Sequence, residues 1–430
     1  MINNMISMFK NKEIRNKILF TLAMLFVFRF GAAITVPGVN TAALEAGLQD
    51  NSFLSMLNML GGGGIEQFSI FALGVGPYIT ASIIIQLLSM DVIPALSELA
   101  KSGASGRKKM DRYTRYLAVV LGFVQAYTMM LSFGVGNETI FTTATVSTYL
   151  YIATLLIAGS MFLLWIGDRI STKGIGNGIS MIIFAGIVAK LPTQFVTTFK
   201  DLIGTGAASA VFNGILMFSL YLLCYLCIIV LVVLMQTAER KIPIQYTSST
   251  VQTKKKDMTY LPLKINSASV IPVIFSSAVM VAPVTIAGFF KENEFIRIMN
   301  KVLGFQTWYS LLLYVILIIS FTFFYTKLQV DPEKIAENLG KSGTYIPGIR
   351  PGTETKQYIN KVLNRITVLG SVCLAFIAVL PYALPMFTNL PKSMGLGGTG
   401  IIIVVGVAME TVKQIEGQMT QKSYRGFIQR

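Results

Sequence analysis

The chain has 430 residues, of which 53% are hydrophobic and 13% are charged, and its mean hydropathy is +0.64. Soluble proteins carry charge on about a quarter of their residues, so a soluble globular fold is disfavoured. The net charge of +16 would suit a nucleic-acid-binding protein, but the basic residues lie between apolar windows, the pattern that encodes membrane topology. No nucleic-acid specificity is therefore expected. The sequence contains no histidine, which excludes histidine-activated nucleophiles and HExxH zinc sites.

Ten apolar windows predict ten transmembrane helices, and therefore an all-α polytopic membrane protein. Each window is near the about 20 residues that cross a hydrocarbon core, where backbone amides must be satisfied within a helix. The first window alone would resemble a signal peptide, but the spans after it indicate a retained helix. In chain order the windows lie near 18–36, 70–89, 113–133, 148–167, 179–197, 211–236, 268–289, 308–327, 362–381 and 397–412.

The distribution of basic residues predicts the orientation of these spans. Most of the 36 Lys and Arg residues fall in alternate gaps, beginning with the N-terminal segment and ending with the C-terminal one. Because cytoplasmic loops carry the excess of Lys and Arg, both termini are predicted to be cytoplasmic. The gaps at 190–210 and 290–307 fit this pattern least well.

Ten spans divide into two sets of five, at 1–200 and 201–430. An odd number of spans per half inverts the second half, as in transport proteins whose path lies at the repeat interface. The halves show no convincing sequence similarity to each other, so the inverted arrangement is inferred from the count alone.

Residues 53–69, FLSMLNMLGGGGIEQFS, depart from the pattern of simple spans. The segment lies on the predicted external side and begins with an apolar run that is too short to span, which the glycines Gly61–Gly64 then interrupt. Such a helix is either re-entrant within the protein or lies flat on the membrane surface. The residues alone favour neither interpretation.

Two predicted cytoplasmic gaps, about 237–265 and 328–361, are long and basic. Loops of this length are uncommon unless they are functional, although a solvated cytoplasmic loop is the ordinary alternative. The spans themselves contain almost no ionisable residues, which disfavours a proton- or sodium-coupled carrier. Gln86 and Gln125 lie within spans, where they either join helices or line a wet crevice. Cys224 and Cys227 share a helix face and are interpreted as packing residues.

Several long segments resemble the SecY family, the pore-forming subunits of the bacterial Sec translocase. They are VFRFGAAITVPGV (27–39), FALGVGPYITASIIIQLL (71–88), GRKKMDRYTRY (106–116), GIGNGISMIIFAGIVA (174–189), YLPLKINSASVIPVIFSS (260–277), FFYT (323–326), ENLGKSGTYIPGIRPG (337–352) and LGGTGIIIVVGV (396–407). The resemblance implies a multi-pass protein of the bacterial cytoplasmic membrane, with an hourglass pore that conducts unfolded secretory proteins and releases membrane helices laterally into lipid.

The resemblance also assigns residues to the pore. An aliphatic ring that closes around a passing chain corresponds to Val75, Ile79, Ile179, Ile183, Ile274 and Ile403. Without the resemblance these residues would be read as lipid-facing or core aliphatics. A polar cluster at the lateral gate corresponds to Gln86, Gln125 and Asn266. The resemblance identifies 53–69 as a re-entrant plug, with Phe53, Leu54, Met56, Leu57, Leu60, Gly61, Gly62, Gly63 and Gly64 as its residues.

The two long loops correspond to the docking site of the SecA ATPase and the ribosome, with Arg240, Lys241 and Arg350 as contact residues. SecE and SecG subunits, signal peptides, preproteins and membrane lipid are the other partners that the resemblance implies. No enzymatic activity, catalytic residue, cofactor or metal is expected. A secondary transporter, an intramembrane protease and an accessory paralogue of the family are the alternatives.

Overall fold

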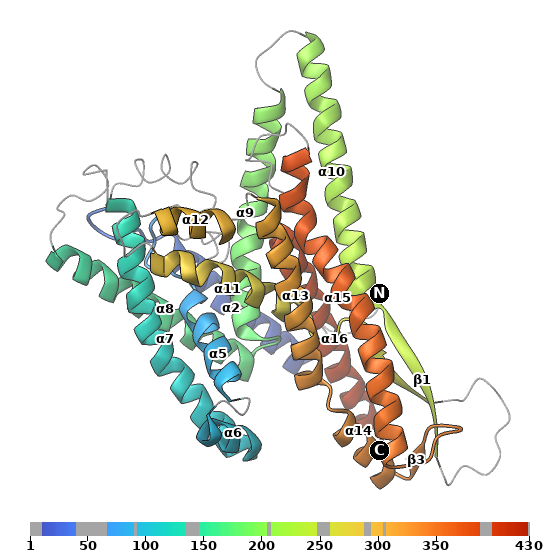
Figure 1. Cartoon of the computed structure of the whole chain (residues 1–430). Coiled ribbons are helices and arrows are strands. Elements are labelled where there is room, and N and C mark those ends of the chain that lie inside the picture. Colours follow the sequence, from blue (N-terminus) through green and yellow to red (C-terminus); the bar gives the residue numbers. More distant parts are fainter. Residues whose placement is uncertain are drawn as a thin grey trace. The chain divides into compact units, whose positions relative to one another are not determined.

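The computed structural model describes residues 11–39, 67–89, 93–134, 146–203, 208–246, 259–287, 294–303, 307–387 and 398–428. The chain forms two compact units. Figure 1 labels their helices and strands. Unit one contains Met1–Val211, Ala278–Ser310 and Val407–Arg430, and unit two contains Phe212–Ser277 and Leu311–Gly406. The helices α11 (Ile271–Ala287) and α16 (Gly398–Ile428) contribute residues to both units.

Helices make up most of the described part of unit one. Its helices are α2 (Lys12–Ala32), α5 (Gly76–Leu88), α6 (Pro94–Lys101), α7 (Gly103–Gly134), α8 (Val146–Lys173), α9 (Gly178–Ile203) and α12 (Glu294–Leu303). The local sequence favours the start of several of these helices. The Asn11 side chain accepts a hydrogen bond from the Glu13 amide at the start of α2. Proline is the second residue of α5 and the first residue of α6.

The core of unit one lies where α7 and α8 pack against the segment that precedes α5. Phe68, Met130 and Leu156 are fully buried in this core. Small residues on α8 allow close packing: a Cβ atom at Gly159 would overlap the backbone oxygen of Ile70, and the neighbouring Ser160 hydroxyl donates a 2.8 Å hydrogen bond to the Gly74 carbonyl. Small residues have this role wherever membrane helices meet closely.

Residues 34–36 and 68–70 form a short antiparallel contact in unit one. An isolated bridge pairs Thr35 with Ser69, and the Val36 amide donates to the Phe68 carbonyl at 2.9 Å. The Ile70 amide donates to the Ile34 carbonyl at 3.1 Å. These bonds join the end of α2 to the segment leading into α5.

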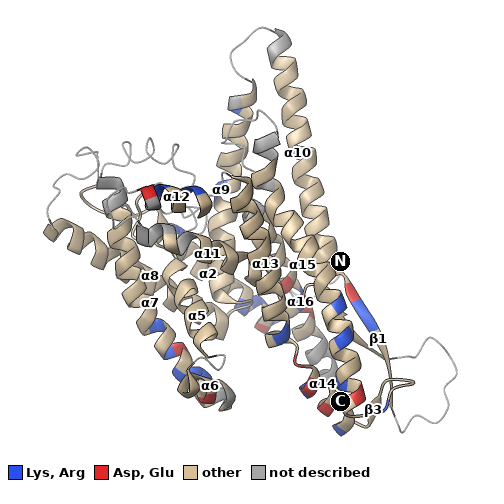
Figure 2. Cartoon of the chain, in the orientation of Figure 1, with Lys and Arg blue, Asp and Glu red and all other residues tan. Residues whose placement is uncertain are grey.

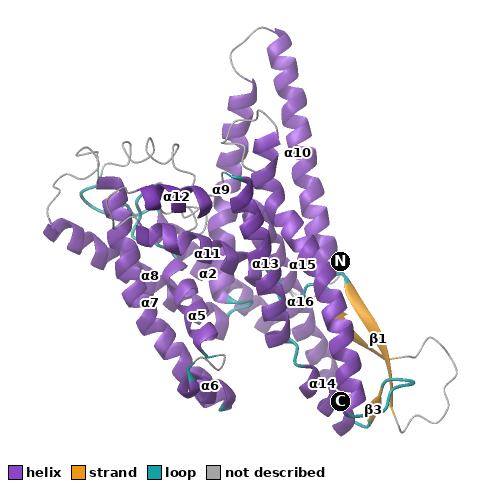
Figure 3. Cartoon of the chain, viewed as in Figure 1, coloured by secondary structure: helices purple, strands orange, loops and turns teal. Residues whose placement is uncertain are grey.

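Unit two combines long apolar helices with a small sheet, which Figure 3 shows in orange. Its helices are α10 (Ala208–Thr237), α13 (Trp308–Gln329), α14 (Pro332–Lys341) and α15 (Thr353–Phe387), and its strands are β1 (Glu239–Tyr246), β2 (Thr259–Lys264) and β3 (Thr344–Tyr345). The strand order is β2-β1-β3. Both β2 and β3 run antiparallel to β1. The pairing with β2 extends from Glu239↔Lys264 to Ile244↔Thr259. The pairing with β3 consists of Gln245↔Tyr345 and Tyr246↔Thr344.

Each of the ten apolar windows lies on a helix of the structure, namely α2, α5, α7, α8, α9, α10, α11, α13, α15 and α16. Among the described residues, five helices are long and apolar enough to cross a membrane. They contain Val146–Lys173, Gly178–Lys200, Val211–Thr237, Trp308–Lys341 and Thr353–Leu380, while Gly76–Leu88 and Ile271–Met280 are shorter apolar helices. The helical fold is therefore confirmed, and the small sheet is an addition that hydropathy did not predict. The division at residue 200 stays a prediction.

Candidate functional site

The two long basic loops fold together in unit two into a compact element that we call the sheet platform: β1, β2, β3, α14 and the first turns of α15. Its core joins described residues from both loops. Ile242 and Leu263 come from β1 and β2, Leu339 comes from α14, and Ile346 and Ile359 lie on either side of the turn before α15. All five are less than a tenth exposed. The platform is therefore a packed structure rather than a pair of solvated loops.

Arg240 and Lys241, two of the predicted docking residues, are exposed on β1. Successive side chains of a strand point to opposite faces, so these neighbours present their charges on different sides of the sheet. The Lys241 Nζ atom lies 3.7 Å from the Glu239 Oε1 atom, whereas Arg240 forms no ion pair with any residue that the structure describes. Of the two side chains, the Arg240 guanidinium is therefore the one without an ion-pair partner among the described residues.

Arg350, the third predicted docking residue, follows a tight turn over Ile346–Ile349. Pro347 is the second turn residue, Gly348 is the third with φ of 83°, and the Ile349 amide donates to the Ile346 carbonyl at 3.1 Å. Proline followed by a positive-φ glycine is typical of a type II turn. The Arg350 carbonyl also accepts a 2.8 Å hydrogen bond from the Thr355 hydroxyl at the start of α15. The backbone of Arg350 is thus fixed while its side chain is exposed.

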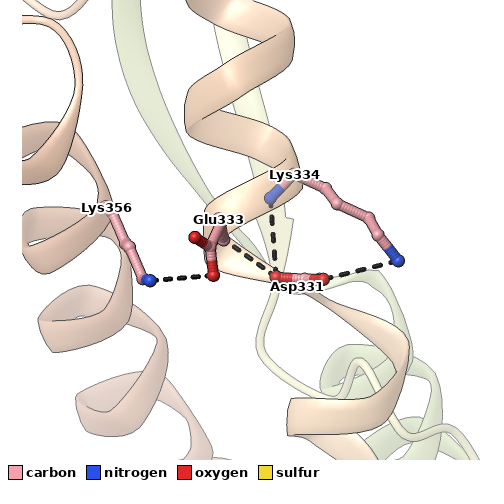
Figure 4. Close-up of polar contacts among 4 residues, drawn as sticks. All are labelled: Asp331, Glu333, Lys334 and Lys356. Atoms are coloured by element: carbon pink, nitrogen blue, oxygen red, sulfur yellow. Dashed lines mark hydrogen bonds and ion pairs between the residues drawn. The ribbon is translucent and has the colours of Figure 1, made fainter. Parts of the chain in front are cut away.

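Figure 4 shows the polar contacts that fix α14 beside α15. The Asp331 side chain caps α14 by accepting hydrogen bonds from the Glu333 amide at 3.0 Å and the Lys334 amide at 3.5 Å. The Lys356 Nζ atom of α15 donates to the Glu333 Oε2 atom at 2.8 Å. Hydropathy missed these residues, although an aspartate directly before a proline is a signal for a helix start.

Replacing Asp331 with alanine is expected to weaken the platform. The variant loses the cap of α14, which costs about 1 kcal/mol, and the buried Leu339 belongs to this helix. Limited proteolysis of the purified protein should show faster cleavage within 331–345. Asp331→Asn keeps an acceptor oxygen and should be cleaved at the parent rate. Equal cleavage of all three proteins would contradict the role of the cap.

Charged side chains gather on the described parts of the platform, as Figure 2 shows for β1 and α14. The helix α10 has no charged residue, and the sequence of α15 is charged only up to Arg365. The described part of the chain contains no group of three His, Cys, Asp or Glu side chains that could hold a metal ion. What the platform offers chemically is a packed surface on which Arg240 and Arg350 are exposed and form no ion pair with any other residue that the structure describes.

The predicted ring residues lie on four different helices. Val75 is the N-cap of α5 and its carbonyl accepts a 3.1 Å hydrogen bond from the Ile79 amide in the first turn, while Ile179 and Ile183 lie at the start of α9. Each pair is four residues apart, so its members share one helix face. Ile274 lies on α11 and Ile403 on α16, in the parts of those helices that belong to unit two. The ring assignment stays a prediction.

The three predicted gate amides also come from both units. Gln86 on α5 and Gln125 on α7 belong to unit one, where these helices pack together. The Gln86 side chain donates to the Ser82 hydroxyl at 3.3 Å. Asn266 belongs to unit two, where its Nδ2 atom donates to the Ser269 carbonyl at 2.9 Å across a turn in which Ser269 has φ of 56°. That contact gives Asn266 a local structural role before α11.

The plug residues, from Phe53 to Gly64, lie outside the described residues. So do Lys254, Lys255 and Lys256, three consecutive lysines in the first of the two long basic loops. The described part of the predicted plug segment is its end, residues 67–69. It includes the fully buried Phe68, which has φ of 42°, and Ser69 of the bridge to Thr35. This end is anchored in the core of unit one.

Comparison with solved structures identifies the fold. The chain aligns over 94% of its length, and over 92% of the other chain, with a structure described as "The structure of a protein conducting channel" (TM-score 0.67, 19% identity). It aligns over the same shares with "Sec61 in the Canine ribosome-channel complex from the endoplasmic reticulum" (TM-score 0.61, 18% identity). A SecY structure whose plug domain is described as stabilising the closed state matches with a TM-score of 0.68 and 18% identity. The fold is that of a helical protein-conducting channel.

Sequence relatives define the family. The SecY family model matches residues 69–412. The chain is 46% identical to the protein translocase subunit SecY of Staphylococcus aureus, with 99% of each chain covered, and 44% identical to SecY 1 of Lactobacillus kefiranofaciens, with 100% of each covered. SecY of Halalkalibacterium halodurans is 46% identical, again with full coverage. The chain belongs to the SecY family. It is a channel subunit of protein translocation and a protein of the bacterial membrane.

Proposed function

We propose that the chain conducts unfolded secretory proteins across the cytoplasmic membrane and releases membrane helices laterally into lipid, with both termini in the cytoplasm. The observation that carries this proposal is the end-to-end identity of 44 to 46% with SecY translocase subunits. The energy comes from a partner, and the chain itself is no enzyme and needs no cofactor. An almost complete lack of ionisable residues within the spans supports a passive path.

The path is closed by the six aliphatic ring residues. Branched aliphatic side chains close around an extended chain without fixed polar contacts, so any side chain passes while ions leak little. The shared helix face of Val75 and Ile79, and that of Ile179 and Ile183, supports this assignment. Family members commonly have isoleucine where this chain has Val75, so the ring here is slightly wider.

Segment 53–69 is the plug of the resting channel, and the gate opens beside Gln86, Gln125 and Asn266. Amide hydrogen bonds between membrane helices contribute roughly 0.6 to 2 kcal/mol each, which is small enough for an apolar signal helix to displace. The halves 1–200 and 201–430 surround the path. Signal peptides and membrane lipid meet at the gate.

The partners on the cytoplasmic side are the SecA ATPase and the ribosome, and both dock on the sheet platform. A channel related in fold was solved in a ribosome complex, which supports a ribosome contact. The rigid backbone and exposed guanidinium of Arg350 suit an acidic or phosphate group on the partner. SecE and SecG complete the membrane complex.

Reconstitution tests the proposal. The chain is purified with SecE and SecG, placed in proteoliposomes, and supplied with SecA, ATP and a radiolabelled preprotein. We expect the preprotein to become protected from external protease only when ATP is present. An assembled complex that protects no preprotein would contradict the proposal. Gradient-driven uptake of a small solute by the same vesicles would instead favour a secondary transporter.

A further inference from the structure

Three polar residues of α16, all in the part of the helix that belongs to unit one, contact other helices of that unit along a single helix face. The Gln414 Oε1 atom accepts a 2.8 Å hydrogen bond from the Gly176 amide, between the ends of α8 and α9. The Thr411 Oγ1 atom lies 3.6 Å from the Met181 Sδ atom on α9. The Gln418 Oε1 atom accepts a 3.4 Å hydrogen bond from the Lys17 Nζ atom on α2. A spacing of three and four residues places these side chains in one stripe.

The stripe meets the turn 174–178, the GIGNG segment, whose backbone amides are bound by side chains from several helices. Besides the Gly176 contact, the Ile175 amide donates to the buried Thr21 hydroxyl of α2 at 3.0 Å. The Gly178 amide donates to the Ser171 hydroxyl of α8 at 2.8 Å. Side chains of α2, α8 and α16 therefore hold the backbone of this turn in place.

The glycines of this turn are needed for that geometry. Gly176 has φ of 86°, a left-handed conformation that other residues rarely adopt. A Cβ atom at Gly174 would overlap the Thr21 hydroxyl, and one at Gly178 would overlap the backbone oxygen of Gly167. A larger residue at these positions would displace the backbone amides that donate hydrogen bonds to Thr21, Ser171 and Gln414.

We propose that Thr411, Gln414 and Gln418 form a latch that fixes the carboxy-terminal helix on the 174–178 turn, with Gln414 as the central positioning residue. The latch has a consequence for the path, a step that rests on the proposed ring. The helix α9 begins at Gly178 and carries Ile179 and Ile183, while Ile403 lies on α16 about three turns before Gln414. The latch fixes the turn from which α9 begins, and so the position of Ile179 and Ile183 in the proposed ring.

The latch itself is tested by hydrogen exchange of the complex with SecE and SecG. Gln414→Leu removes the acceptor, so the 174–178 segment should exchange roughly fivefold faster, which corresponds to about 1 kcal/mol. Gln414→Glu keeps an acceptor oxygen and should exchange at the parent rate, as should Glu410→Gln on the same helix. Unchanged exchange in Gln414→Leu would overturn the latch. Gln418→Leu, at the other end of the stripe, serves if the first variant fails to assemble, and it should raise exchange near Lys17.

The link to the path is tested by the ion conductance of the resting complex in planar bilayers. Gln414→Leu should raise the conductance severalfold, and Gln414→Glu should restore the parent value. The variant Ile183→Gly, which removes a proposed ring side chain, is measured in parallel and should also conduct ions. If Ile183→Gly leaks and Gln414→Leu does not, the latch has only a structural role and its link to the path is wrong. If Ile183→Gly does not leak, the ring assignment is wrong. The hydrogen-exchange measurement on Gln414→Leu then still tests the latch.

Discussion

Replacing Arg350 with glutamate is expected to stop SecA-driven import while the complex still assembles in the membrane. The turn at Pro347 and Gly348 and the hydrogen bond from Thr355 hold the backbone of this residue whatever its side chain. The substitution therefore changes the charge presented to a partner rather than the platform. Removing one partner of a close charge pair costs about 2 to 5 kcal/mol, so import should fall at least roughly thirtyfold. ATP-dependent protection of a preprotein in proteoliposomes measures the effect.

Arg365→Glu provides the matched control for this variant. Arg365 is also exposed and lies on α15, but it is outside the turn that presents Arg350. The same reversal of charge there should leave import near the parent rate. Near-normal import by Arg350→Glu would refute the docking assignment. Equal defects in both variants would indicate a general effect of the net charge, because neither position would then be specific.

Replacing Gly159 with alanine, which adds one methyl group, is expected to destabilise unit one strongly. In Gly159→Ala the new Cβ atom overlaps the Ile70 backbone oxygen, so α8 must move away from the segment before α5. That movement also stretches the bond from Ser160 to the Gly74 carbonyl and loosens the core around Phe68. Overpacking of this kind costs about 1 to 3 kcal/mol. Thermal unfolding of the solubilised protein should show a lower midpoint.

Gly76→Ala is the control for this prediction. Gly76 begins α5, and a Cβ atom there would meet no other atom within 4 Å. Since alanine is favoured over glycine in helices, this variant should be as stable as the parent or slightly more stable. If the two alanine variants unfolded at the same temperature, the close approach of α8 to Ile70 would not be a source of stability.

The helices were predictable from sequence because the signal is local. A window of about 20 apolar residues needs only its own backbone hydrogen bonds to form a span, so each window of the sequence became a helix. The sheet was not predicted, although Ile242 and Ile244 alternate with polar residues on β1. Its strands are short, Pro243 and Pro262 weaken the strand signal, and the residues that bury Ile242 come from α14 and α15 much later in the chain.

The candidate site was predictable in part for similar reasons. The turn that presents Arg350 follows from the local sequence Ile-Pro-Gly-Ile, which specifies a type II turn. The contact of Gln414 with Gly176 joins residues 238 positions apart, and no periodic pattern in either segment indicates it. The ring and gate residues depend on packing among several helices, which a single sequence does not encode in any local pattern. Those assignments therefore came from the resemblance to the family.

The bridge between Thr35 and Ser69 bears on how this region can change during evolution. Its hydrogen bonds run between backbone groups, so they place few demands on the side chains at these positions. They also bring the end of α2 and the segment before α5 together, whatever the number of residues between them. Because the entropy of closing a loop rises only slowly with its length, insertions and deletions there cost little stability. A change in the number of residues between Thr35 and Ser69 would therefore leave the pairing of these two segments unchanged.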